Sequence, residues 1–164
     1  MIVAPAGVAL LVALWRLDGP SLWRDEAVTA GVSRLPVGDM LAVLSRTDAV
    51  HGVYYLLMHV VQRAFGGGEA ALRLPSVLAT VAAAAGTAAV GRRLGGRWPG
   101  LAAGLLFAGA PLISRYAQEA RSYAIVTALA VTATYLLVRA VDGGGRCASV
   151  SPPCAHLAVA GGAS

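Results

Sequence analysis

The sequence predicts an all-α integral membrane protein with about four transmembrane helices and one amphipathic helix that lies in the membrane interface. Composition is the first reason: 57% of the 164 residues are hydrophobic and only 13% are charged, whereas soluble domains carry about 25% charged residues. The second reason is that three uncharged apolar runs approach the ~20 residues that a helix needs to cross a bilayer. The third is that the charged residues gather between these runs and not inside them.

The first predicted span covers residues 2–15, an apolar run of 14 residues. A helix of that length reaches about 21 Å, against a hydrocarbon core of about 30 Å. The run lacks the basic start and the small-residue cleavage site of a signal peptide. We therefore expect a membrane span whose beginning is shortened.

The other three predicted spans cover residues 74–90, 98–114 and 122–138. They are rich in Ala and Gly, which let helix backbones approach closely inside a membrane bundle. Pro75 and Pro99 stand near the beginnings of two of these spans. A proline is tolerated in the first helical turn because its missing N–H needs no partner there, so we expect both prolines to mark helix starts.

Residues 51–65, HGVYYLLMHVVQRAF, form a shorter segment with a polar stripe. His51, Tyr55, His59 and Gln62 follow one another at spacings of four, four and three, so they share one face of a helix. Valines and leucines occupy much of the remaining surface. This pattern indicates an amphipathic helix in the membrane interface and not a further span.

Topology follows from the arginine-rich segment 91–98, GRRLGGRW. The positive-inside rule places this segment in the cytoplasm. Residues 16–71 then form one exoplasmic loop that contains the interfacial helix, and the turn at residues 118–121 faces the same side. If residues 51–65 crossed the membrane, the first span would be reversed. We expect a multi-pass protein of the plasma membrane with its active site on the extracytoplasmic side.

Three polar clusters converge on this predicted outer face. The first is Arg24-Asp25-Glu26, and the second is Asp48 and His51 with the pair Tyr54-Tyr55. The third is the segment 118–123, with Arg115 and Tyr116 one turn earlier. Adjacent like charges repel each other, and apolar surroundings add a cost in lost hydration, which favours a function. The simpler alternatives are an acidic pair exposed in a loop and charges that anchor the ends of spans.

Composition also argues against other classes of partner. The net charge is +5, but the arginines are scattered along the chain, so we expect no nucleic-acid partner. Cys147, Cys154 and His156 do not have the spacing of a known metal site. We expect no metal site and no cofactor, and the sequence does not decide whether the reaction needs a divalent metal.

Four stretches of the sequence carry a family resemblance. They are LWRDEA at 22–27, TDAVHGVYYLLMHV at 47–60, GGGEAALRLPSVL at 66–78 and SRYAQEARSYA at 114–124. In order and spacing they resemble motifs of the GT-C class of polyprenol-phosphate-sugar-dependent glycosyltransferases. The agreement is best with the protein-mannosyltransferase-like branch, which includes the aminoarabinose-transferase type, and it extends over roughly residues 15–140. The chain has Gly52-Val53 where this family usually has Pro-Pro.

The resemblance implies both a reaction and an architecture. Members of this class move a sugar, mannose or another, from a polyprenyl-phosphate donor in the bilayer to a protein, lipid or glycan acceptor on the outer face. A single displacement would invert the anomeric carbon. Members are longer than this chain, so residues 1–141 are expected to be the N-terminal portion of a larger multi-span fold. Residues 142–164 change abruptly to Gly, Ser, Pro and Cys and are expected to be a disordered or frameshifted tail.

The resemblance also implies roles for the acidic pair. Asp25 would be the general base that accepts the proton of the acceptor hydroxyl. Glu26 would orient Asp25 or contact the sugar or the acceptor. The two carboxylates are thus the candidate catalytic residues.

Five further residues are candidates for substrate binding by the same resemblance. Arg73 and Arg121 would hold the lipid phosphate, for which forked guanidinium donors are suited, or would pair with the carboxylates. His51 and Tyr55 would line the donor site from the interfacial helix. Glu119 would position Arg121.

Two other readings of the sequence remain open. One is a non-catalytic membrane protein that binds polyprenyl-phosphate lipids or forms part of a transporter. No ionisable residue lies in the middle of the three clear spans, which argues against a path for ions or protons. The other reading is a truncated fragment that has no activity of its own.

Overall fold

The computed structural model describes residues 1–15, 24–47 and 51–148. Over these residues it confirms the all-α class, with eight helices and no strand. The first four helices are α1 (Val3–Leu14), α2 (Arg24–Val32), α3 (Val37–Thr47) and α4 (Gly52–Phe65). The last four are α5 (Glu69–Gly95), α6 (Arg97–Gly109), α7 (Pro111–Ala117) and α8 (Tyr123–Ala148).

Two helices, α5 and α8, are long and apolar enough to cross a membrane, and α6 with α7 makes a third span if this bent pair is counted as one. Helix α5 has 27 residues and therefore reaches about 40 Å. Helix α1 is apolar but has only 12 residues, or about 18 Å, less than the hydrocarbon core of about 30 Å. The chain is a helical membrane protein.

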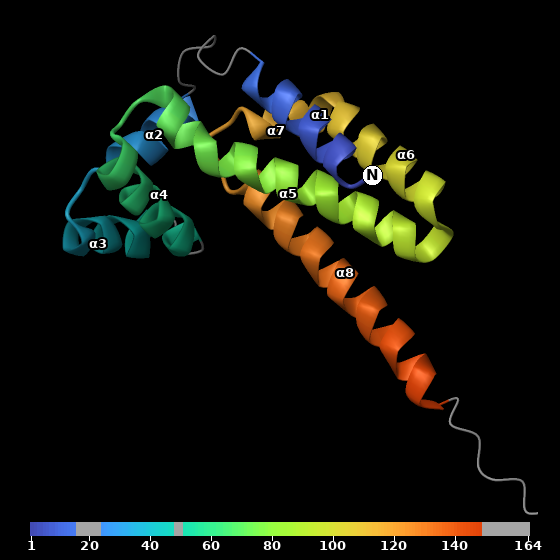
Figure 1. The fold of residues 1–164 in the computed structure, drawn as a ribbon. Helices are drawn as coiled ribbons and strands as arrows, with labels where there is room; N and C mark the ends of the chain where they lie inside the picture. Colours follow the sequence, from blue (N-terminus) through green and yellow to red (C-terminus); the bar gives the residue numbers. More distant parts are fainter. Residues whose placement is uncertain (16–23, 48–50, 149–164) are drawn as a thin grey trace, which may run out of the picture.

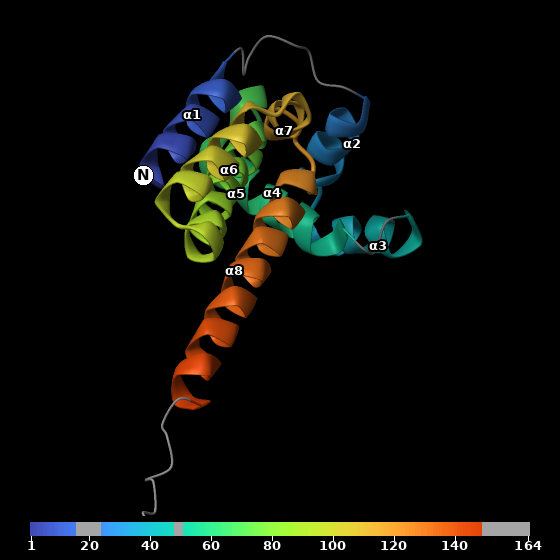
Figure 2. The same ribbon diagram turned by 90° about the vertical axis from the view of Figure 1, so that its right-hand side faces the viewer.

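Helix α5 is the centre of the molecule. Helices α1 and α6 pack against α5 and against each other, and α8 packs on α5 and extends past it (Figure 1). Helices α2, α3 and α4 gather beside the beginning of α5, on the other side of the molecule from α1 and α6 (Figure 2). This arrangement brings the beginning of α5 close to segments that are distant in the sequence.

Small residues set the distance between α1, α5 and α6. A Cβ atom added to Gly100 would lie 2.6 Å from the backbone nitrogen of Arg92. A Cβ atom added to Gly104 would lie 2.8 Å from side-chain atoms of both Ala88 and Pro5. Neither position has room for a side chain, so the helices are in backbone contact, which is typical of membrane helices rich in Gly and Ala.

We expect Gly100→Ala to lower the free energy of unfolding by about 1–3 kcal/mol, because α6 has to move away from α5 to admit the methyl group. Gly7→Ala is the matched control, since a Cβ atom on Gly7 in α1 meets no atom within 4 Å. That control is expected to be neutral or stabilising by up to ~1 kcal/mol. Denaturant unfolding in detergent micelles measures both variants. Equal stabilities would contradict the close packing of α5 and α6.

The predicted span 98–114 is not one straight helix. Helix α6 ends at Gly109, α7 begins at Pro111, and the two are bent by 63°. Ala110 between them is extended, with φ −68° and ψ 125°. The ring of a following proline disfavours the α conformation, so Pro111 ends α6 and redirects the chain. The bend lets α7 contact α1, α5 and α8.

Helix α5 begins earlier than the sequence predicted. It starts at Glu69, so Pro75 lies inside the helix and not at its start. The carbonyl four residues before Pro75 therefore lacks its usual N–H donor. Pro99 does lie in the first turn of α6. Gly66 and Gly96, which follow α4 and α5, have φ of 85° and 88°, a conformation that glycine adopts without strain.

Helix α4 coincides with the predicted segment 51–65. Its polar stripe faces the protein: Tyr55 is buried, and His59 and Gln62 are half-buried, where α4 packs against α2 and α3. On the opposite face, Val53 is 82% exposed and Val60 is 62% exposed. An outward apolar face suits a helix that lies on a membrane surface. Helices α2 and α3, which the sequence did not predict, occupy much of the remaining loop.

The end of the chain differs partly from the prediction. Helix α8 continues to Ala148, so the first residues of the expected tail 142–164 are helical. The rest of that tail lies outside the described residues, as does Asp48.

Candidate functional site

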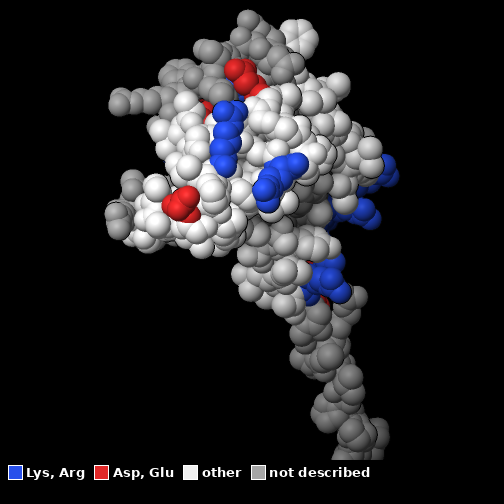
Figure 3. Space-filling model, turned by 90° about the vertical axis from the view of Figure 1, so that its left-hand side faces the viewer, with Lys and Arg blue, Asp and Glu red and all other residues white. Residues whose placement is uncertain are grey.

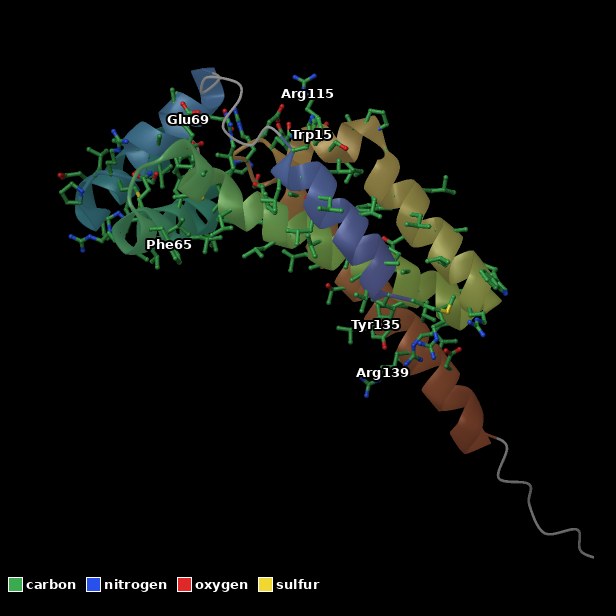
Figure 4. The ribbon with its side chains drawn as sticks, turned by 45° about the horizontal axis from the view of Figure 1, so that its top comes forward. Trp15, Phe65, Glu69, Arg115, Tyr135 and Arg139 are labelled. Atoms are coloured by element: carbon green, nitrogen blue, oxygen red, sulfur yellow. The ribbon has the colours of Figure 1, made fainter. Side chains whose placement is uncertain are left out.

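The two ends of the helix bundle carry different groups. Arg92 and Arg93 lie in the last turns of α5, and Arg93 donates a 3.3 Å hydrogen bond to the hydroxyl of Tyr135 in α8. The opposite end, where α5 begins and α7 lies, carries Arg115 and the end of α1. Figure 4 labels Tyr135 and Arg139 at the first end and Trp15 and Arg115 at the second. The candidate site lies at this second end.

A buried ion pair joins α2 to α5 here. Nε and Nη2 of Arg73 donate to Oε1 and Oε2 of Glu26 at 3.3 and 3.1 Å, the two-pronged geometry in which arginine and carboxylate bind most strongly. The two side chains are only 1% and 2% exposed. Glu26 also lies in the first turn of α2, where the helix dipole favours negative charge. Each residue compensates the buried charge of the other.

The turn between α7 and α8 is tied to this ion pair. The backbone N–H of Ala120 donates to Oε1 of Glu26 at 2.7 Å. The hydroxyl of Ser76 in α5 donates to the carbonyl of Glu119 at 2.8 Å. The side-chain amide of Gln118 donates to the backbone carbonyl of Trp15, the residue that follows α1, at 2.7 Å. Segments that are 43 to 103 residues away in the sequence thus hold the turn in place.

A cavity of about 320 Å³ opens beside this turn. Two carboxylates, those of Glu26 and Glu119, and two guanidinium groups line it. The full lining is Glu26, Leu112, Arg115, Tyr116, Glu119, Arg121 and Tyr123. The rings of Tyr116 and Tyr123 contact each other, with their centroids 5.1 Å apart. Such a lining can bind an anion and present a carboxylate and aromatic surface to the rest of the same ligand.

Glu119 has a partner that the sequence did not predict. Its carboxylate accepts a 2.9 Å hydrogen bond from Nε of Arg115, one helical turn earlier. The backbone also joins Glu119 to Arg121, because the Arg121 N–H donates to the Glu119 carbonyl at 2.9 Å. The Arg115 side chain is 65% exposed, and exposed pairs of this kind contribute little to stability. The Arg115–Glu119 pair forms part of the rim of the cavity. The buried pair of Glu26 and Arg73 contributes more to the stability of the fold.

Tyr54 of α4 lies close to the ion pair. It packs with Met58, Leu72 and Ala120 in a buried cluster, and its hydroxyl has no hydrogen-bond partner within the described residues. Burial, and then the neighbouring Glu26 carboxylate, raise the pKa of Tyr54 well above its usual value. Tyr54 therefore stays protonated at physiological pH.

The other predicted site residues fall in different places. Asp25 lies in the first turn of α2, but its side chain is outside the described part of the structure. Tyr55 is buried with Met40 and Leu44 between α3 and α4. His51 is the residue that precedes α4, and neither it nor Tyr55 lines the cavity. The predicted residues that do line it are Glu26, Glu119 and Arg121.

Four lining residues were not among the predicted site residues: Leu112, Arg115, Tyr116 and Tyr123. Arg115, Tyr116 and Tyr123 belong to the third polar cluster of the sequence, but no role in the site was predicted for them. The sequence does contain a signal for Leu112 and Arg115, because positions 112, 115 and 119 recur at spacings of three and four, which is the spacing of residues on one face of a helix. An arginine and a tyrosine at the end of a span are also typical of membrane anchoring, so the pattern alone did not separate the two roles. Within the described residues, no three His, Cys, Asp or Glu side chains could hold a metal ion together.

The fold and the cavity define a class, namely a helical membrane protein with carboxylates and guanidinium groups gathered at one end of its helices. A family model described as dolichyl-phosphate-mannose-protein mannosyltransferase matches residues 52–149, more than half of the chain. The chain belongs to this family of membrane glycosyltransferases. The match includes Arg73, Glu119 and Arg121 and begins after Asp25 and Glu26. No curated protein and no solved structure matches the chain.

Proposed function

We propose that the chain transfers a sugar from a polyprenyl-phosphate donor to an acceptor hydroxyl on the extracytoplasmic side of the plasma membrane. The cavity carries this proposal, because it gathers carboxylates and guanidinium groups from α2, from α7 and from the turn before α8. Family membership supports the class of reaction. The opposite end of the helices carries the arginines of segment 91–98, which the positive-inside rule assigns to the cytoplasm, so the cavity faces outward.

The donor phosphate is bound by Arg121, with Arg115 at the rim. Both guanidinium groups line the cavity, and arginine presents paired donors that match phosphate oxygens. Arg73 has a structural role instead, because its guanidinium holds Glu26. The tyrosine pair offers an aromatic wall for the sugar, and the prenyl chain lies in the bilayer beside exposed apolar residues such as Leu112.

Asp25 is the general base, and Glu26 is a positioning residue. The acceptor oxygen attacks the anomeric carbon while its proton passes to the Asp25 carboxylate. The bond between that carbon and the phosphate oxygen breaks, and polyprenyl phosphate leaves with the bonding electrons. One such displacement inverts the anomeric centre. Glu26, bound to Arg73 and Ala120, holds the first turn of α2 at the cavity and thereby places its neighbour.

A transfer assay with labelled polyprenyl-phosphate mannose and variant Arg121→Gln tests this function. Loss of a hydrogen bond to a charged phosphate costs about 1.5–3 kcal/mol, so we expect kcat/KM to fall about 10- to 100-fold. Arg97→Gln, at the opposite end of the helices, is the matched control and should retain full activity. In sealed right-side-out vesicles, a water-soluble acceptor added outside should be modified.

Three results would overturn the proposal. Donor binding without any transfer would identify a lipid-binding protein instead of an enzyme. Modification of the acceptor only in inside-out vesicles would place the cavity on the cytoplasmic side. Equal losses in Arg121→Gln and Arg97→Gln would separate the reaction from the cavity.

A further inference from the structure

A second polar hollow lies away from the candidate site, between helix α4 and the loop that joins α2 to α3. It has a volume of about 540 Å³, and we call it the α4 groove. None of its lining residues lines the cavity of the candidate site. The polar groups that line it come from Ser33, Arg34, His59, Gln62, Arg63 and Gly67.

Hydrogen bonds hold the floor of the α4 groove in a defined shape. Nε2 of Gln62 donates to the carbonyl of Ala30 at 3.2 Å and to the hydroxyl of Ser33 at 2.5 Å. The ring of His59 is hydrogen-bonded through Nδ1 to the carbonyl of Ser33 at 2.9 Å, so Nδ1 carries the proton, because a carbonyl can only accept. These contacts fix α4 against the α2–α3 loop.

Among the residues that the structure describes, no carboxylate pairs with either arginine of the α4 groove. Arg34 donates there to two neutral oxygens, Oε1 of Gln62 at 3.3 Å and the carbonyl of Gly67 at 3.4 Å. Arg63 makes no hydrogen bond and no ion pair within the described part of the chain. An arginine has five N–H donors, so most of those on the two side chains remain available to an anion. No acidic residue in the described structure lines the groove.

An exposed apolar face borders this basic groove. Val53, Leu57 and Val60 share one face of α4 and are 82%, 41% and 62% exposed. Phe65, the last residue of α4, is 67% exposed. Arg63 follows Val60 by three residues, so the two are neighbours on the helix surface. Figure 3 faces the side of the molecule that holds α3 and α4, where basic and acidic side chains stand on a largely uncharged surface. Figure 4 labels Phe65 on this part of the molecule.

We propose that the α4 groove binds the phosphate of an anionic phospholipid headgroup from the surrounding bilayer. The positive charge of the two arginines favours a phosphate, and the exposed apolar face of α4 favours a lipid. Val53, Leu57 and Val60 insert among acyl chains at the membrane surface, which brings the headgroup phosphates to the level of Arg34 and Arg63. A phosphate there supplies the negative charge that the protein does not. The site is independent of the proposed transfer reaction.

The test uses a single tryptophan as a local reporter of the bound lipid. Phe65→Trp is made in a chain whose own tryptophans are replaced with phenylalanine, and the protein is reconstituted in mixtures of phosphatidylcholine and phosphatidylglycerol. Quenching by the brominated form of each lipid gives their relative binding constant beside the α4 groove. We expect a clear preference for phosphatidylglycerol, which Arg34→Gln and Arg63→Gln each reduce about five-fold.

Two controls make the result specific. Trp98 kept as the only tryptophan reports on the opposite end of the protein, beside Arg97, and its lipid preference should not change in the Arg34 or Arg63 variants. Gly67→Ala keeps both charges but places a Cβ atom 2.8 Å from Nη2 of Arg34, so it should displace that guanidinium and weaken the preference. Equal quenching by the two lipids at position 65 would overturn the proposal. So would loss of the preference in excess inorganic phosphate, which would indicate a site for a soluble anion.

Discussion

Replacing Asp25 with Asn is expected to abolish sugar transfer while the protein still inserts into the membrane and binds the donor. The asparagine side chain has the same shape but cannot accept the proton of the acceptor hydroxyl. A positioned general base contributes about 10²- to 10⁴-fold to a rate, so kcat should fall by that factor with little change in KM. Steady-state transfer from labelled polyprenyl-phosphate mannose in the intact enzyme measures both constants.

Asp39→Asn is the matched control for this experiment. Asp39 is an exposed acid in the first turn of α3 and does not line the cavity, so its replacement should leave kcat unchanged. Both variants carry the same change of charge, which removes any effect of net charge from the comparison. An Asp25→Asn enzyme that transfers sugar at the parental rate would eliminate Asp25 as the base.

The second large effect is expected in the buried ion pair. Arg73→Met should lower the free energy of unfolding by about 3–5 kcal/mol, because it leaves the Glu26 carboxylate buried without the guanidinium. The same variant should lose transfer activity, since the first turn of α2 and the turn at Ala120 both depend on Glu26. Denaturant unfolding in detergent micelles and the transfer assay measure the two effects.

A double variant and an exposed pair provide the controls. Adding Glu26→Gln to Arg73→Met removes the second buried charge and should recover much of the lost stability. Arg115→Met breaks the pair with Glu119, whose arginine is 65% exposed, and should cost at most ~1 kcal/mol. If Arg73→Met were no more destabilising than Arg115→Met, the buried pair would not be a support of the fold.

Local patterns were sufficient to predict several parts of this protein. Runs of apolar residues predicted the helices that became α5 and α8, and the polar stripe of residues 51–65 predicted α4 almost to the residue. These features depend on hydrophobicity and on the 3.6-residue period, which operate between near neighbours. The same reasoning did not predict the 63° bend within the span 98–114, because it gave too little weight to the effect of Pro111 on the residue before it.

The partners of the charged groups could not be predicted from local patterns. The sequence left Arg73 with two roles, a lipid phosphate or a carboxylate, and the tertiary structure shows it bound to Glu26, 47 positions away. The Ala120 N–H on the same carboxylate is 94 positions away from it, and no spacing rule connects the two. Glu119 lies two residues beyond the end of α7, and the turn there brings its carboxylate to Arg115 within α7.

The sequence by itself therefore determined the all-α membrane class, the amphipathic helix at residues 51–65 and the polar segments from which the candidate site is built. Only the tertiary structure decided which of these segments meet, which arginine is buried in an ion pair and which guanidinium groups line the cavity. The physical reason is range: helix formation and membrane partition depend on residues within a few turns of each other. An ion pair forms wherever packing brings two charges together, however far apart they are in the chain.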